Sequence, residues 1–166
     1  MLRTMMRDGQ NQSPSRSRKM EDEPFLRALR RLRKNYEDKT ASTTDLMHIF
    51  ESELPPSLWY EGHKSLDWFY EGWINGNAIP AFDLRDVKFT DKEKSKTTLV
   101  TGTLIQEHSP DTLVTAVPLY ASIGGKNIFL KRIFAEGDET QFRISAPAGT
   151  RRLVIDPEQT LLSRAR

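Results

Sequence analysis

The chain has 166 residues, a length that suits one compact domain or two small ones and excludes a large multidomain assembly. It contains no cysteine, which excludes disulfide frameworks, thiolate zinc sites and thiol nucleophiles. Any catalysis would therefore depend on oxygen, imidazole or amine groups. No run approaches the ~18 consecutive apolar residues of a membrane span, and no secretory signal is present, so we expect a cytoplasmic chain as written.

The charge is distributed unevenly along the chain. Overall, 25 Lys and Arg nearly balance 23 Asp and Glu. Residues 1–40, however, carry 11 basic and 6 acidic side chains, whereas residues 41–166 carry 14 basic and 17 acidic ones. This asymmetry predicts that the N-terminal part differs in kind from the remainder.

The N-terminal part has the pattern of a loop followed by short helices. Residues 8–22 contain a single apolar side chain and predict a flexible loop. Apolar residues then recur at helical spacing in three segments, near 25–36, 42–54 and 66–73. Ser42 and the residues after it supply caps for the second helix, which should run to about Pro55 and Pro56. Asn75 to Asn77 and then Pro80 end the third.

Six short runs rich in β-branched and aromatic residues follow, with turn residues at every break. They span residues 81–89, 97–106, 113–121, 127–134, 139–145 and 150–155. Strands at this spacing, joined by turns this tight, predict an antiparallel sandwich or barrel. We therefore expect two domains, a helical segment over residues 1–80 and a β domain over 81–163.

One polar stripe has the spacing of a metal site. His63, Asp67 and Glu71 stand four residues apart, so on a helix they would share one face. That face lies opposite the apolar side of the same segment, where ordinary solvated residues belong. We therefore interpret the stripe as surface and expect no metal there.

Two further clusters suggest binding surfaces. One is aromatic and could stack on sugars or bases, although core or interdomain packing explains it better; it comprises Trp59, Tyr60, Trp68, Phe69, Tyr70, Trp73, Phe82 and Phe89. The other is basic; it comprises Arg16, Arg18, Lys19, Arg27, Arg30, Arg31 and Lys34. No aromatic residue in the basic cluster is placed to stack on a base, so we expect no nucleic-acid partner.

The remaining candidates have ordinary structural interpretations. Gly124 and Gly125 predict a hairpin turn, because no helix pattern follows them. His48 and His108 have no partner at ligand spacing. At Asp156-Pro157, an Asp that bonds to nearby backbone amides is commoner than a carboxylate in a site.

Two segments look familiar: the run from Leu66 to Pro80 (LDWFYEGWINGNAIP) and the run from Thr150 to Pro157 (TRRLVIDP). They resemble the "FF-x-x-W-v-x-G-x-x-i-P" and "v-x-l-D-P" elements of the aminopeptidase N (membrane alanyl aminopeptidase) family of zinc metallopeptidases. Met1 to Met6, Phe25 to Leu32 and Ser42 to Glu51 resemble the family's preceding helices in the same order. The resemblance implies an α+β chain, with short helices before an immunoglobulin-like antiparallel β-sandwich.

The catalytic motifs of that family are missing. None of the three histidines is followed by Glu, so there is no H-E-x-x-H, and the G-x-M-E-N-type strand is also missing. We therefore assign no catalytic, cofactor-binding or metal residue, and the family zinc would be bound by a part not present. The resemblance implies a non-catalytic C-terminal piece of a zinc aminopeptidase, from a truncated gene, a misassigned start or a split subunit.

The expected partners follow from this resemblance. They are the missing catalytic portion, or a second copy bound through the helical segment; the parent family is often membrane-associated or secreted. Two alternatives stay open: a free-standing β-sandwich that binds a protein or glycan through its aromatic cluster, and a fragment with no function of its own.

Overall fold

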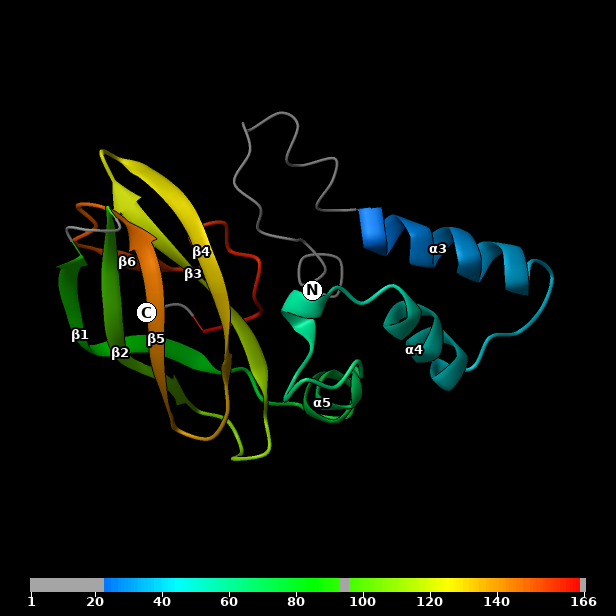
Figure 1. The fold of residues 1–166 in the computed structure, drawn as a ribbon. Coiled ribbons are helices and arrows are strands. Elements are labelled where there is room, and N and C mark those ends of the chain that lie inside the picture. Colours follow the sequence, from blue (N-terminus) through cyan, green and yellow to red (C-terminus); the bar gives the residue numbers. More distant parts are fainter. Residues whose placement is uncertain (1–22, 93–95, 165–166) are drawn as a thin grey trace. The chain divides into compact units, whose positions relative to one another are not determined.

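The structure is a computed structural model that describes residues 23–92 and 96–164 (Figure 1). The chain divides into two compact units, Met1–Trp68 and Phe69–Arg166, named here the helical unit and the β unit. The loop predicted over residues 8–22 and the Met1 to Met6 motif lie outside the described residues. Residues 69–80 thus belong with the strands, although the sequence pattern placed them with the helices.

Two amphipathic helices make up most of the described helical unit. Helix α3 spans Glu23–Tyr36 and helix α4 spans Thr43–Ser52. A capping box starts α4: the Ser42 hydroxyl accepts a hydrogen bond from the Asp45 amide at 3.1 Å, and the Asp45 carboxylate accepts one from the Ser42 amide at 2.9 Å. This confirms the predicted cap, which satisfies amides that have no partner within the helix.

Short helical pieces connect α4 to the first strand. They are the 3-10 helix η1 (Pro56–Leu58), the short α5 (Asp67–Phe69) and the π-helical turn η2 (Tyr70–Ile74). In η2 the Asn75 amide donates to the Tyr70 carbonyl at 2.9 Å, the wider spacing that defines a π-helix. The third predicted helix is therefore present over residues 67–74, as three α-helical residues that continue directly into a π-helical turn.

Six antiparallel strands form the β unit. They are β1 (Ala81–Lys92), β2 (Thr97–Glu107), β3 (Thr115–Ile123), β4 (Lys126–Ala135), β5 (Glu139–Pro147) and β6 (Leu153–Ile155). One sheet has the order β1-β2-β5 and the other β4-β3-β6 (Figure 1). All six strands were predicted, and the α+β class is confirmed.

The two sheets share one hydrophobic core. Its buried members come from strands of both sheets; they are Phe82, Val100, Leu104, Val117, Leu119, Ala135, Phe142, Ile144 and Ala146. Burial of each Val, Leu, Ile or Phe side chain in it contributes roughly 1.5–3 kcal/mol, so this shared core holds the sheets together. The β unit is therefore a two-layer structure.

Turn geometry confirms the predicted hairpin between β3 and β4. Gly124 and Gly125 have φ of 56° and 76°, a region that glycine enters at no steric cost. Ile123 pairs with Lys126, so these two glycines are the whole loop. A two-residue loop with two positive φ angles matches the right-handed twist of the strands it joins.

Candidate functional site: the basic helix of the helical unit

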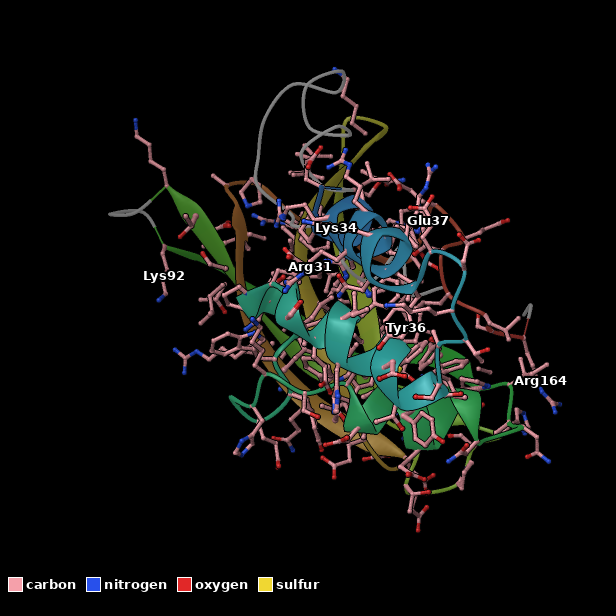
Figure 2. All side chains as sticks on the ribbon, turned by 90° about the vertical axis from the view of Figure 1, so that its right-hand side faces the viewer. Arg31, Lys34, Tyr36, Glu37, Lys92 and Arg164 are labelled. Carbon is pink, nitrogen blue, oxygen red and sulfur yellow. The ribbon has the colours of Figure 1, made fainter. Side chains whose placement is uncertain are left out.

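Helix α3 is the most strongly charged element that the structure describes. It carries five basic side chains and one acidic one, Glu23. Figure 2 labels two of the basic residues, Arg31 and Lys34. Pro24 and Ala28 are buried, and they mark the side of the helix that packs inward.

Aromatic and polar contacts join α3 to α4. The rings of Phe25 and Phe50 lie 5.5 Å apart in a tilted arrangement, a geometry typical of favourable aromatic pairs. Ala28, one turn after Phe25 on the same helix, is fully buried. The two helices therefore pack as one piece.

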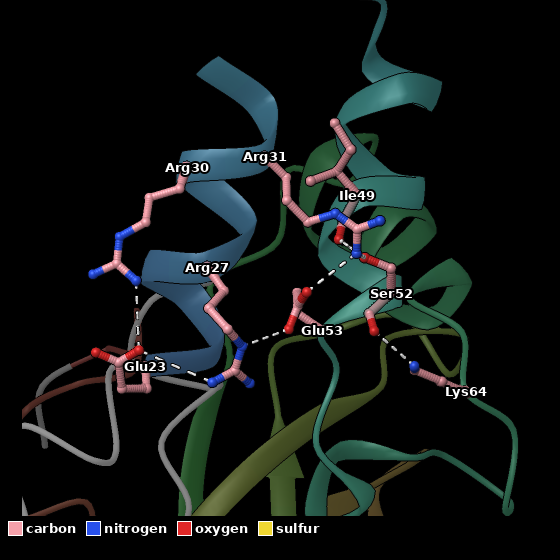
Figure 3. A network of polar contacts seen from close by, with 8 residues as sticks. All are labelled: Glu23, Arg27, Arg30, Arg31, Ile49, Ser52, Glu53 and Lys64. Atoms are coloured by element: carbon pink, nitrogen blue, oxygen red, sulfur yellow. Dashed lines mark hydrogen bonds and ion pairs between the residues drawn. The ribbon is translucent and has the colours of Figure 1, made fainter. Parts of the chain in front are cut away.

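Glu53 lies at the centre of a polar network beside this contact (Figure 3). Its carboxylate accepts hydrogen bonds from Arg27 Nε at 2.7 Å and from Arg31 Nη1 at 3.1 Å. Arg31 Nη1 also donates to the Ser52 hydroxyl at 2.8 Å. The Glu53 side chain is only 15% exposed, so this carboxylate binds α3 from a largely covered position.

The pKa of Glu53 is lowered from its ordinary value. The hydrogen bond from Arg27 is the largest cause, burial opposes it, and the hydrogen bond and charge of Arg31 add to the lowering. A carboxylate with a lowered folded-state pKa stabilises the fold above its unfolded pKa, about 4.3 for Glu. This stabilisation is lost as the pH falls through the folded pKa.

We expect Glu53→Gln to weaken the attachment of α3 to α4 by about 1 kcal/mol. This value is below the roughly 1.5–3 kcal/mol of a hydrogen bond to a charged group, because both guanidinium groups are about half exposed to water. Amide hydrogen exchange at α3 should speed up several-fold at neutral pH. The difference from the unmutated chain should shrink as the pH falls through the lowered pKa of the folded state, where the native Glu53 also becomes protonated.

Glu37→Gln is the matched control, since it removes the same charge from an exposed position just after α3. It should leave the exchange of α3 nearly unchanged at every pH. Equal effects of the two substitutions would show that net charge, rather than the Glu53 network, determines the exchange rates.

The opposite side of α3 remains open to solvent. Leu29 is 38% exposed, and Leu26 is half-buried. Arg30, Arg33 and Lys34 are exposed beside them. Arg30 lies 3.6 Å from Glu23, whereas no ion pair is found for Arg33 or Lys34 among the described residues.

The three residues with the spacing of a metal site, His63, Asp67 and Glu71, do not share one helix face. His63 lies before α5, in an isolated bridge with Tyr60. Asp67 accepts a hydrogen bond from the Ser65 hydroxyl at 2.6 Å, and Glu71 accepts one from Asn75 at 3.3 Å. Nowhere in residues 23–92 and 96–164 do three or more His, Asp or Glu side chains group as metal ligands.

The aromatic cluster is used mainly for packing. Trp68, Phe69 and Phe82 are buried, and the Trp73 indole donates to the Val114 carbonyl at 3.1 Å. Trp59 is 37% exposed, and its indole donates to the Leu54 carbonyl at 3.2 Å. This confirms the packing interpretation for the buried members.

The other candidates also have structural surroundings. His48 lies exposed on α4, and His108 is exposed with φ of 61°. Asp156 accepts hydrogen bonds from the Leu161 amide at 2.7 Å and the Thr160 hydroxyl at 2.6 Å, which confirms the predicted turn. Arg16, Arg18 and Lys19 of the basic cluster lie outside the described part of the chain.

An open pocket lies at one end of the β unit. It is lined by Asp91, Lys92, Lys96, Thr97, Ala148 and Gly149. Arg151 binds the Asp91 carboxylate with two guanidinium nitrogens, and this contact, with a hydrogen bond from Thr98, lowers the pKa of Asp91. Asp91 thus links the end of β1 to the segment before β6, a structural role.

Sequence reasoning missed Glu53, the residue that organises the basic helix. Nothing in its local pattern marks it, because its partners are separated from it by 26 and 22 residues. No helix in the described part of the chain combines the length and the apolar character needed to cross a membrane. Comparison with family models, with curated proteins and with solved structures gives no match.

Proposed function

We propose that the chain is a non-catalytic, C-terminal type of domain of a zinc aminopeptidase, which supports a separate catalytic portion. The observation that carries this proposal is the structural role of the residues that match the family's motifs. Described residues that match the family's motifs cap helices, close turns or pack. Residues of this kind build a fold and do not form a catalytic site. A resemblance confined to them therefore supports a structural, non-catalytic role.

The matching α4 residues hold the helix and the chain that follows it. Ser42 and Asp45 form the capping box, and Phe50 packs on Phe25. The Glu51 carboxylate accepts a hydrogen bond from the Leu66 amide at 2.9 Å, which fixes the approach to α5. These roles support the comparison with the "s-T-x-D-l-x-x-x-F-E" helix of the family.

Trp73 of η2 and Gly76 just after it match the family motif, and together with Gly72, which falls on a variable position of that motif, they make close contacts within the β unit. A Cβ atom on Gly72 would lie 2.8 Å from Leu113 Cδ1, and one on Gly76 would lie 2.1 Å from the Gly72 carbonyl oxygen. Trp73 donates to the Val114 carbonyl. The glycine of the spacing "W-v-x-G" therefore has a steric reason in this chain, because Gly76 cannot be replaced without movement of the backbone around Gly72.

We further infer that the β unit is immunoglobulin-like. The order β1-β2-β5 corresponds to strands A-B-E of that fold, and β4-β3-β6 corresponds to C′-C-F. The chain visits these strands in the order A, B, C, C′, E, F, which supports the assignment. A domain of this kind after helices is what the resemblance implies.

The purified full chain is expected to lack aminopeptidase activity. Hydrolysis of a peptide bond by this chemistry needs a metal as Lewis acid and a general base, and the sequence has no H-E-x-x-H to supply them. Metal analysis after purification without chelator should find well under one zinc per chain, and aminoacyl p-nitroanilides should not be hydrolysed. One tightly bound zinc that His63→Ala removes would contradict the proposal.

The positive test is co-purification from the native cells. A tagged full chain should carry with it a polypeptide that contains H-E-x-x-H, and the mixture should hydrolyse aminoacyl p-nitroanilides until a chelator is added. Zinc should restore the activity. A chain that purifies without any metallopeptidase under gentle conditions would contradict the proposal and favour a free-standing binding module.

A further inference from the structure

We propose that the outer face of α3 binds an acidic amphipathic helix of the partner polypeptide. The outer face is the set Leu26, Leu29, Arg30, Arg33 and Lys34. At 100° per residue, Leu26, Arg30 and Arg33 lie on the side of the helix opposite the buried Ala28. This inference rests on the proposed function for the identity of the partner. The chemistry of the surface itself does not depend on that function.

The positive charge of the outer face favours a negatively charged partner. Glu53 binds Arg27 and Arg31, and this leaves three basic residues for the outer face. Of these, Arg30 lies 3.6 Å from the partly exposed Glu23, and the described chain offers no acidic partner to Arg33 and Lys34. Carboxylates on a docked helix would complement these charges and raise the association rate.

The N-terminal segment of the chain itself does not have the required charge. Residues 1–22 carry five basic and three acidic side chains. A second copy would present an α3 of the same sign, and like charges brought together across an interface are unfavourable. A partner with acidic side chains therefore fits the face better than either of these occupants.

The two leucines distinguish a protein partner from a phosphate surface. Leu29 is 38% exposed one turn before Arg33, and Leu26 is half-buried one turn before Arg30. Phosphate binding would make no use of an exposed leucine, and one such leucine is too little apolar surface for insertion into a lipid bilayer. A helix with leucines along one side and carboxylates beside them would contact both features.

The experiment titrates the full chain with a synthetic peptide of about three heptads that has Leu at positions a and d and Glu at e and g. A matched peptide has Lys in place of each Glu. Fluorescence anisotropy at low salt measures the affinity, and backbone NMR shifts locate the contact. The Glu peptide should bind at least about tenfold more tightly than the Lys peptide and shift the amides of α3.

Two variants and a control test the face itself. Leu29→Gln removes the exposed apolar group, and Arg33→Glu reverses one charge; each should weaken binding of the Glu peptide by about five- to tenfold. Lys131→Glu makes the same charge change on an exposed position of β4 in the β unit. It should change the affinity less than about twofold.

Several results would overturn the proposal. They are equal binding of the two peptides, shifts confined to elements other than α3, and no binding of the Glu peptide. Binding of duplex DNA or anionic vesicles that Arg33→Glu abolishes, while the Glu peptide leaves α3 unaffected, would also overturn it. The co-purification described above can succeed in each of these cases, so failure here is separable from failure of the proposed function.

Discussion

Leu104→Ala is expected to lower the free energy of unfolding of the β unit by about 2–5 kcal/mol. Leu104 lies in β2, is fully buried, and belongs to the core shared by both sheets. Its removal loses the transfer free energy of the deleted atoms and leaves a cavity that the sheets cannot close completely. Urea denaturation followed by strand circular dichroism should show an earlier midpoint with an unchanged slope.

Leu162→Ala is the control for this experiment, because Leu162 is 55% exposed. The same chemical change there should cost no more than about 0.5 kcal/mol. Comparable losses at the two positions, or a loss below about 1 kcal/mol at Leu104, would mean that the two sheets do not share a close-packed core.

Gly102→Val is expected to destabilise the β unit by about 3 kcal/mol through overpacking. Gly102 pairs with Phe142 across β2 and β5. A Cβ atom on Gly102 would lie 2.9 Å from Phe142 Cζ and 3.2 Å from Val87 Cγ2. The Phe142 ring is buried, so it has little room to move away.

A double-mutant cycle isolates this contact. Gly102→Ala should cost clearly more in the unmutated chain than in a Phe142→Leu background, because Leu lacks the end of the ring that a new methyl group would meet. Denaturation midpoints of the four chains supply the comparison. Strict additivity would show that some other feature of position 102 requires glycine.

Much of the fold follows from local patterns in the sequence. The helical spacing of apolar residues located α3 and α4, and Ser42 marked the start of α4. The β-branched runs and turn residues located all six strands, including the Gly124-Gly125 hairpin. These features were predictable because each depends on the backbone preferences of a few neighbouring residues.

The candidate surface was only half predictable. Its basic residues were evident in the sequence, but the sequence did not show which of them are already paired. Glu53 divides the basic residues into two groups. It binds Arg27 and Arg31, whereas Arg33 and Lys34 have no acidic partner among the described residues. The spacing that placed His63 on one helix face with Asp67 and Glu71 was misleading, since the chain turns at His63 and the helix starts only at Asp67.

The sequence by itself determined the α+β class, the order of the elements and the capping and turn residues. Only the tertiary structure decided the pairing of strands into two sheets, the need for glycine at position 102 and the side of α3 that stays exposed. The physical reason is the distance along the sequence between the residues that interact. Caps and turns form among residues a few positions apart, whereas Gly102 meets Phe142 and Arg27 meets Glu53 only after packing brings distant segments together.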